Sequence, residues 1–345
     1  LVGDYYVAFD KHYKQEVATL MEQGMSKEEA EAASPLMNEA REMLVKWESN
    51  DKDIVLLWSQ MNSWVYDGFE QTHKKLNIRF DSCYYESQTY LLGKEIVQQG
   101  LEKNVFYREE DGSVWVDLES KGLDKKIVLR SDGTSVYITQ DLGTAQARHK
   151  ELQKDHYIYV VADEQDYHFK VLFETLKLLE EPYANGLYHL AYGMVELPTG
   201  RMKSREGTVV DADDLIQEVE SEAKLVAEER GEIVHLNEEE KSQVYHQIGM
   251  AALKYFMLKV QAKKRMIFDP KESVDMQGNT GPYIVNAYVR IKSIERKQTI
   301  QNITNFSETI VDQEKELMKL VMEYKTVIDD AVKEYDPAGV ANYCY

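Results

Sequence analysis

Three cationic side chains alternate in a glycine-flanked loop near the middle of the chain. Residues 200–207 read Gly-Arg-Met-Lys-Ser-Arg-Glu-Gly, between an apolar, strand-like run and an acid-capped helix. The chain has neither G-x-x-x-x-G-K-[ST] nor G-x-G-x-x-G, which excludes the two commonest phosphate-binding loops. A mobile cationic loop can still hold a triphosphate if its cations converge on it; an ordinary solvated connection is the alternative. The candidate residues are Arg201, Met202, Lys203, Ser204 and Arg205.

A second polar segment lies about 60 residues upstream. It follows a short strand candidate at 126–129 and begins with an Asp-Gly turn, which is typical of a chain reversal. Thr134 or Ser135 can cap the helix that follows, which is expected to run to about Lys150. This pattern predicts a strand, a turn and a helix.

Tyr137 and Asp141 are four residues apart, so they share one face near the start of that helix. A buried-strand run at 156–162 comes next and ends in a polar stretch that contains Gln165 and His168. In a doubly wound α/β sheet, ligands bind at the carboxyl ends of strands. Both polar stretches are therefore candidate binding segments.

Four blocks of the sequence follow one another in a defined order. They are Asp-Gly-Thr-x-x-Tyr-x-x-x-Asp at 132–141, Gln-x-x-His at 165–168, Gly-x-Met-x-x-Arg-x-Gly at 200–207 and Asp-Met-Gln-Gly-Asn-Thr-Gly-Pro-Tyr at 275–283. Together they resemble the arginyl-tRNA synthetases, a class I family, and Gly-Asp-Tyr-Tyr-Val at 3–7 resembles a helix of that family's insertion region. The resemblance covers essentially the whole chain, as an internal part of a longer enzyme.

The resemblance implies an activity and its partners. The expected reaction is the ATP-dependent activation of L-arginine to arginyl-adenylate and its transfer to tRNA(Arg), with ATP bound together with Mg²⁺ and no metal site built from protein side chains. The substrate carboxylate attacks the α-phosphate in line, so the protein supplies positioning and charge stabilisation. The loop at 201–205 fits the stabilisation of the leaving pyrophosphate. A cytoplasmic monomer is expected.

The same resemblance assigns roles to individual residues. A buried guanidinium must be paired with an anion and have its five donors satisfied. Asp141 matches the family's arginine-binding Asp, Tyr137 its arginine-binding Tyr and Gln165 its substrate-contacting Gln. His168 is placed on the ATP side or packs beneath it. The alternative for Asp141 is an exposed first-turn acid favoured by the helix dipole.

The phosphate loop departs from the family patterns. Its Met-Lys-Ser-Arg differs from the Lys-Met-Ser-Lys-Ser pattern of class I synthetases and from the Met-Ser-Thr-Arg form of arginyl enzymes. Whether Lys203 or Arg205 reaches the pyrophosphate therefore stays open. No two of the eight histidines form the family's His-x-Gly-His element, and the N-terminal tRNA-contacting domain is not found. We therefore expect residues 1–345 alone to be inactive.

Composition narrows the class of protein. A chain of 345 residues with 43% hydrophobic content can bury a large core and form two or three domains. Cys83 and Cys344 lie far apart, outside any metal-ligand spacing, which argues against structural zinc and for a reducing compartment. No signal peptide or long apolar run suggests a membrane. A net charge of −20 argues against a generic nucleic-acid binder, although basic clusters at 254–265 and 290–297 could form local faces or solvated helix flanks.

The predicted fold class is α/β: an incomplete Rossmann-like parallel-sheet catalytic core with a helical insertion and a helical C-terminal region. Apolar periodicity predicts helices over 4–23 and 51–76, and a capping box opens a short helix at 26–29. Trp47, Trp58 and Trp64 are interpreted as core packing. The expected domains are a helical insertion at 1–76, the second half of the catalytic domain at 77–212, a helical connection at 213–276 and the start of an anticodon-binding domain at 277–345.

The strands of the catalytic part are expected in two groups. Residues 106–108 and 113–118 read as a hairpin around an acidic turn. Strands at 127–130, 156–162 and 188–197 alternate with helices, which predicts half of a parallel sheet. After Asp211, an expected N-cap, the chain is predicted to be helical almost to its end, with a break at 278–282.

Two alternatives remain open from the sequence. A class I synthetase for another amino acid would need a non-acidic pocket where Tyr137 and Asp141 lie. A non-catalytic helical scaffold would have no cleft joining residues 137–141, 165 and 201–205.

Overall fold

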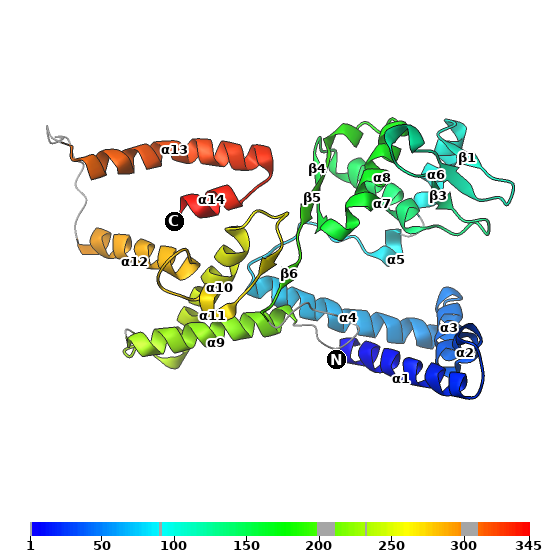
Figure 1. Ribbon diagram of the computed structural model, residues 1–345, viewed down its shortest axis with the longest axis horizontal. Helices are drawn as coiled ribbons and strands as arrows, with labels where there is room; N and C mark the ends of the chain where they lie inside the picture. Colours follow the sequence, from blue (N-terminus) through cyan, green and yellow to red (C-terminus); the bar gives the residue numbers. More distant parts are fainter. Residues whose placement is uncertain (1, 90–91, 199–210, 232, 298–309) are drawn as a thin grey trace. The chain divides into compact units, whose positions relative to one another are not determined.

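The computed structural model describes residues 2–89, 92–198, 211–231, 233–297 and 310–345. The chain forms two compact units: one contains residues 1–80 and 199–250, the other residues 81–198 and 251–345. The helices and strands of each are labelled in Figure 1.

The described part of the first unit is helical, as the apolar periodicity predicts. The capping box is confirmed, because the Glu29 amide donates to Ser26 Oγ and the Ser26 amide donates to the Glu29 carboxylate. Pro35 begins the following helix, where its missing N–H is not needed. The helices are α1 Val2–Glu22, α2 Lys27–Ala33, α3 Pro35–Glu48, α4 Lys52–Lys75, α9 Ala212–Arg230 and the first part of α10 Glu238–Leu258.

The tryptophans of this unit do not form a buried core, and that interpretation is wrong. Neither α3 nor α4 has a buried residue. Trp58 is 38% exposed and Trp64 is 47% exposed, while the ring of the half-buried Trp47 meets Trp58 edge-on at 5.4 Å. The apolar stripe identifies which face of a helix is hydrophobic, but it does not say what covers that face.

The second unit combines helices with three small sheets. Their strand orders are β1-β2-β3, β4-β5 and β6-β7. The strands are β1 Phe106–Arg108, β2 Val114–Val116, β3 Lys126–Leu129, β4 Tyr157–Ala162, β5 Leu187–Tyr192, β6 Val195–Glu196 and β7 Met266–Ile267. The helices are α5 Glu86–Thr89, α6 Gly93–Glu102, α7 Tyr137–Leu152, α8 Asp166–Leu178, the end of α10, α11 Pro270–Ser273, α12 Gly281–Lys297, α13 Asp312–Glu334 and α14 Ala338–Tyr343.

One strand prediction is confirmed and another is wrong. The hairpin exists, with Phe106 opposite Val116. The strand expected at 127–130 does not join a parallel sheet; it is β3, which pairs antiparallel with β2. A short connection after β2 allows the next strand to fold back beside it at a small entropic cost. A strand followed by a helix is thus compatible with either sheet.

The parallel pairing of the next two strands is confirmed. β4 and β5 are joined through α8, and Tyr157 lies opposite Leu187. The strand expected at 188–197 is interrupted, because the Gly193 amide donates to Ala262 O at 2.7 Å and a Cβ at Gly193 would lie 2.6 Å from the Lys264 carbonyl carbon. β6 then pairs in parallel with β7, a strand that the helical reading of this region did not predict.

The main hydrophobic core of the second unit lies among α6, α7, α8 and the strands β1 to β4. Its buried members lie between residues 96 and 184 of the sequence. They come from the β1–β2 hairpin and from the helices that pack on the parallel pair β4 and β5, so both sheets share one core. They include Ile96, Val114, Val116, Leu118, Val128, Leu142, Leu172 and Leu176. This core fixes α7 and α8, which carry the candidate site residues.

Candidate functional site

The start of α7 is locked to β3 by a threonine. Thr139 Oγ1 donates to Val128 O and accepts a hydrogen bond of 3.2 Å from the Val136 amide. Thr139 is fully buried, whereas Tyr137, the first residue of α7, is 79% exposed. The expected cap by Thr134 or Ser135 is wrong, since Thr139 satisfies the Val136 amide at the helix start instead.

The Asp-Gly-Thr turn before α7 is a structural element. Asp132 Oδ1 accepts from the Thr134 amide at 2.8 Å and from its hydroxyl at 2.6 Å. These hydrogen bonds lower the pKa of the Asp132 carboxyl. Gly133 has a φ of +79°, which glycine adopts without strain. Arg130 Nη1 closes the turn by donating to Ser135 O at 2.9 Å.

The backbones of α6 and α7 cross at very short range, and this contact fixes the position of α7. A Cβ added to Gly143 would lie 2.5 Å from the Gly93 amide nitrogen, and one added to Gly93 would lie 2.2 Å from Thr139 O. Both backbones therefore approach more closely than any larger residue allows. Gly143 is two residues after Asp141, so this contact also places the aspartate.

Three consecutive side chains at the start of α8 are bonded to three different parts of the unit. Asp166 accepts from His189 Nδ1, on β5, at 3.1 Å. Tyr167 donates to the carboxylate of Asp124, before β3, and accepts from its amide at 3.2 Å. His168 Nε2 lies 2.6 Å from Asp141 Oδ2, on α7. The carboxyl end of β4 is thereby held at a defined position.

Two of these carboxyls have pKa values below their usual range. The Tyr167 hydroxyl bond and then the Lys126 charge lower the pKa of Asp124. Partial burial works against ionisation of Asp166, but Lys170 and His189 outweigh it and lower the pKa of this carboxyl. The two ionised carboxylates hold the start of α8 in place through Tyr167 and His189.

The structure brings together some of the predicted site residues and not others. Asp141 and His168 share a hydrogen bond. Gln165 lies in the turn after β4, just before α8, and is exposed. Neither the Tyr137 hydroxyl nor the Gln165 amide makes a side-chain hydrogen bond with another described residue. The phosphate-loop residues Arg201, Met202, Lys203, Ser204 and Arg205 lie outside the described residues.

One arginine on the same helix as Asp141 is not among the site residues predicted from the sequence. The Arg148 guanidinium lies 5.0 Å from the ring centre of Tyr84 and 5.9 Å from that of Tyr159. Burial raises the pKa of Tyr159, although Arg148 acts in the opposite direction. Arg148 is seven residues after Asp141, so helical periodicity places both on one side of α7. That spacing is the signal that could have identified it.

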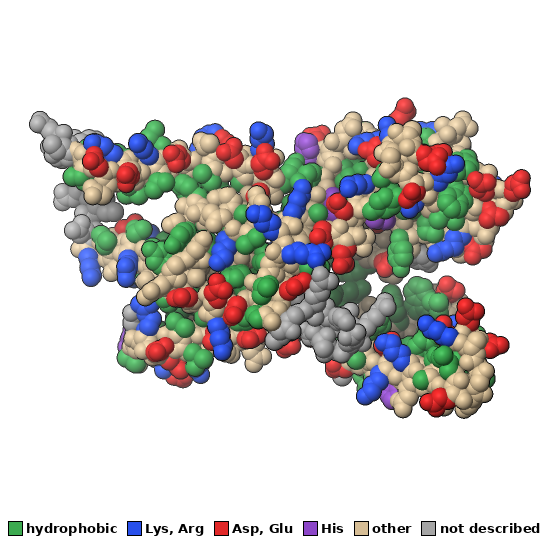
Figure 2. Space-filling model, in the orientation of Figure 1, with side chains coloured by type: hydrophobic (Ala, Val, Ile, Leu, Met, Phe, Trp, Pro, Cys, Tyr) green, Lys and Arg blue, Asp and Glu red, His purple; other side chains and the backbone are tan. Residues whose placement is uncertain are grey.

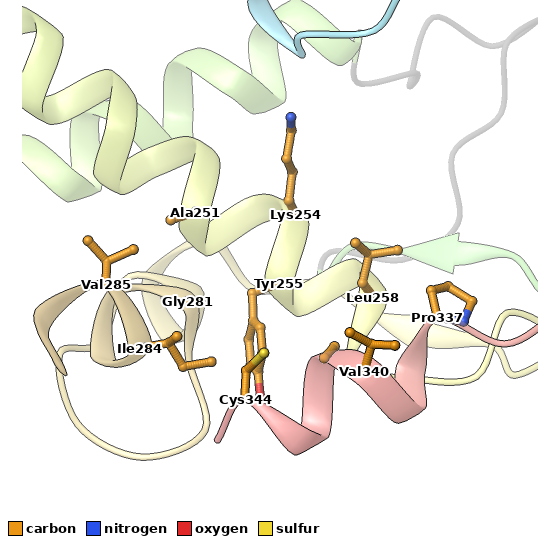
Figure 3. Close-up of a pocket in the computed structure, with 11 residues that line it drawn as sticks. Ala251, Lys254, Tyr255, Leu258, Gly281, Ile284, Val285, Pro337, Val340 and Cys344 are labelled. Carbon is orange, nitrogen blue, oxygen red and sulfur yellow. The ribbon is translucent and has the colours of Figure 1, made fainter. Parts of the chain in front are cut away.

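An apolar groove of about 380 Å³ lies apart from this site, between α10, α12 and α14 (Figure 3). Its walls include Leu258, Ile284 and Val340. Gly281 begins α12 against α10, because a Cβ there would lie 2.0 Å from Ala251 O. The groove therefore forms where the Gly-Asn-Thr-Gly-Pro segment joins the two helices.

The two predicted basic clusters are arranged differently. In the first cluster, Lys259 is bound to the segment that leads into α12. Its Nζ donates to Asn279 O at 3.0 Å and lies 4.3 Å from the Phe256 ring centre. Lys263, Lys264 and Arg265 are exposed, as are the basic residues of α12. Figure 2 shows Lys and Arg interspersed with Asp and Glu on the visible face.

The described residues show neither a metal-binding cluster nor a membrane-spanning helix. They contain no group of three His, Cys, Asp or Glu side chains that could hold a metal ion. None of their helices has the length and apolarity needed to cross a membrane.

Comparisons with known protein families match almost the whole chain. Residues 2–269 match the model described as tRNA synthetases class I (R), catalytic domain, and residues 284–345 match the DALR anticodon binding domain. The arginine–tRNA ligase of Bacteroides fragilis (strain YCH46) is 55% identical over 100% of this chain and 59% of its own length. That of Flavobacterium psychrophilum is 55% identical over 100% of this chain and 58% of its own length. The chain thus spans about three fifths of these relatives.

Solved structures show the same fold at low sequence identity. The arginyl-tRNA synthetase of Plasmodium falciparum superimposes with a TM-score of 0.75 and 21% identity, over 97% of this chain and 58% of that one. The Thermus thermophilus enzyme gives a TM-score of 0.74 and 20% identity, over 98% of this chain and 63% of that one. The expected fold class is therefore confirmed as the fold of these synthetases.

Proposed function

The chain belongs to the class I arginyl-tRNA synthetase family, and from this premise we propose that the whole protein is an arginine–tRNA ligase. It activates L-arginine with ATP, supplied as its Mg²⁺ complex, and transfers the arginyl group to tRNA(Arg). The Mg²⁺ is held mainly by phosphate oxygens, as is usual for this ion with nucleotides. We propose that the protein acts as a monomer in the cytoplasm, where its substrates are found.

The observation that carries this proposal is the carboxylate of Asp141. It lies in the first turns of α7, is 47% exposed, and is held by His168 at the start of α8. A carboxylate offers about four lone-pair positions and pairs with a planar guanidinium through two parallel hydrogen bonds. An anion at this place supports selection of an amino acid with a guanidinium side chain.

We propose roles for three further segments of the chain. Tyr137, one helical turn before Asp141, donates its hydroxyl to the substrate, and Gln165 contacts the substrate from the turn after β4. Their exposed side chains are available for such contacts. The loop at 201–205 stabilises the pyrophosphate as it leaves, a role that rests on the sequence and the family.

Amino-acid-dependent exchange of pyrophosphate into ATP by the whole protein tests the proposal. Arginine should support exchange, and citrulline, which has nearly the same shape but no charge, should support it at least roughly 100-fold less well. Charging of tRNA(Arg) with radioactive arginine tests the second step. Faster exchange with any other standard amino acid would refute the assignment, and so would equal use of citrulline.

A further inference from the structure

Asp141, predicted to bind the substrate, is hydrogen-bonded to His168, another predicted site residue. Within the described part of the chain, no other pair of predicted site residues shares a hydrogen bond. The distance from His168 Nε2 to Asp141 Oδ2 is 2.6 Å. A carboxylate only accepts hydrogen bonds, so Nε2 carries the proton and donates. The two residues are 27 positions apart and lie on different helices, so the bond exists only in the folded unit.

His168 is mounted on a packed aromatic cluster. Its ring meets Phe169 edge-on, with ring centres 5.7 Å apart. Phe169 is 7% exposed; it stacks on His189 at 4.4 Å and also packs against Tyr159 and Phe173. The flanking Tyr167 is tied to Asp124 on the other side. His168 therefore has little freedom to follow Asp141 if the carboxylate turns.

The bond leaves most of the Asp141 carboxylate unused. No described residue donates a hydrogen bond to Oδ1, and Oδ2 keeps one further lone pair after accepting from His168. The side chain of His168 is 26% exposed and that of Asp141 is 47% exposed. The histidine thus fixes one oxygen while the other stays accessible.

We propose that His168 is a positioning residue for the recognition of arginine, which acts through Asp141. By holding Oδ2, it selects one rotation of the carboxylate and presents Oδ1 and the remaining lone pair of Oδ2 to the guanidinium. Pre-orientation of this kind removes the entropy that the carboxylate would otherwise lose on binding. The inference rests on the proposed function and replaces the expected place of His168 beside ATP.

The test compares His168→Leu with His168→Gln in the whole protein. Leucine removes the donor, whereas the glutamine amide nitrogen lies as many bonds from Cα as Nε2 of histidine does. Pyrophosphate exchange is measured with arginine and ATP varied separately. His168→Leu should lower kcat/KM for arginine roughly 10- to 100-fold, as expected for a lost bond to a charged group. The KM for ATP should stay within about twofold, and His168→Gln should recover most of the loss.

A double-mutant cycle asks whether His168 acts through Asp141. If it does, Asp141→Asn with His168→Leu should be within about twofold of Asp141→Asn alone, because coupled residues are not additive. His149→Gln is the matched control, since His149 is also on α7 and stacks on Tyr183, 4.5 Å away, outside the site. It should leave the KM for arginine unchanged.

The outcomes separate this inference from the proposed function. Additive losses, failure of glutamine to recover activity, or a rise in the KM for ATP alone would overturn the positioning role while wild type still uses arginine. An equal effect of His149→Gln would also overturn it, because general loosening of α7 would then explain the loss. A wild-type protein that activates another amino acid would refute the proposed function and this inference with it.

Discussion

Residues 2–80 and residues 92–198 are organised in opposite ways. In the first region, helix ends are set by neighbouring residues, and α3 and α4 leave their apolar faces unburied. In the second, the elements are short, but they enclose a core with fully buried side chains such as Leu142 and Leu172. Local signals are sufficient to form the helices of the first region, whereas the enclosed core of the second region brings elements that are distant in the sequence into fixed contact.

The two regions also differ in how far apart in the sequence their hydrogen-bonded residues lie. Ser26 and Glu29 cap α2 across three residues. By contrast, Tyr167 and Asp124 are 43 residues apart, and His168 and Asp141 are 27 apart. Long-range bonds also occur in the first unit, as between Lys75 and Asp213, but there both side chains are about half exposed. The bonds of Tyr167 and His168 lie beside the buried core that packs α7 against α8.

The largest effect is expected where that packed region serves the substrate. Asp141→Asn preserves the shape of the side chain but removes the charge that pairs with the guanidinium. Loss of one partner of a buried charge pair costs about 2–5 kcal/mol, so kcat/KM for arginine should fall roughly 30- to 5,000-fold. Steady-state aminoacylation by the whole protein, with arginine and ATP varied separately, measures this fall in kcat/KM.

The nucleotide provides the control for Asp141→Asn. The KM for ATP should change much less, because the nucleotide is bound on the other side of the reacting carboxylate. If the variant changed only the dependence on ATP, the guanidinium assignment would be wrong. This face of α7 would then belong to the nucleotide.

A matched pair of leucines tests the difference in packing between the regions. Leu172 is completely buried and Leu56 is 68% exposed. Leu172→Ala should lower the unfolding free energy of its region by about 2–5 kcal/mol through lost burial and a cavity, whereas Leu56→Ala should stay within about 0.5 kcal/mol. Native-state hydrogen exchange of amides in each region measures both. Equal losses would show that α4 is as well packed as α8.

A smaller and local effect is expected at the capping box. Ser26→Ala removes the acceptor for the Glu29 amide, so amides of α2 should exchange roughly fivefold faster. Ser59→Ala, at an exposed serine within α4, should cause no such change. Loss of protection that spread to α6 or α7 would contradict the local character of this region.

The smallest effect is expected from an exposed ion pair. Lys75 Nζ donates to Asp213 Oδ1 at 2.7 Å and Thr72 donates to Oδ2, and these bonds lower the pKa of Asp213. Both charged side chains are about half exposed, so Asp213→Asn should lower stability by only about 0.2–1 kcal/mol at neutral pH and low salt.

The pH dependence has a definite sign. A lowered pKa contributes stability above the unfolded value, near 3.9, and this is lost as pH falls through the folded value. The stabilities of wild type and Asp213→Asn should therefore converge as pH falls below about 4, and become equal once pH is below the lowered pKa of Asp213 in the folded state. Asp214→Asn is the control, since Asp214 makes no side-chain bond with a described residue. A difference that persisted in acid would point to a cause other than ionisation.

The sequence by itself determined features that depend on neighbouring residues. Ser26 with Glu29 predicted a capping box, because the groups of such a box lie within one helical turn. The apolar run at 156–162 predicted a strand followed by a helix, and both exist, but the expected burial of the strand is wrong because Ile158 is 45% exposed and Val160 is 62% exposed. The spacing of Tyr137 and Asp141 placed them on one face of a helix, and the order of the motifs indicated the family.

Only the tertiary structure decided which distant groups meet. A strand pattern at 126–129 does not specify its partner, and β3 joined β2 because that neighbour was near in the chain. The stripe through Trp58 and Trp64 identified an apolar face, but not whether anything would cover it. His168 has no periodic relation to Asp141, and their hydrogen bond arises because the shared core holds α7 beside α8. Such contacts depend on how the core closes, which no local pattern encodes.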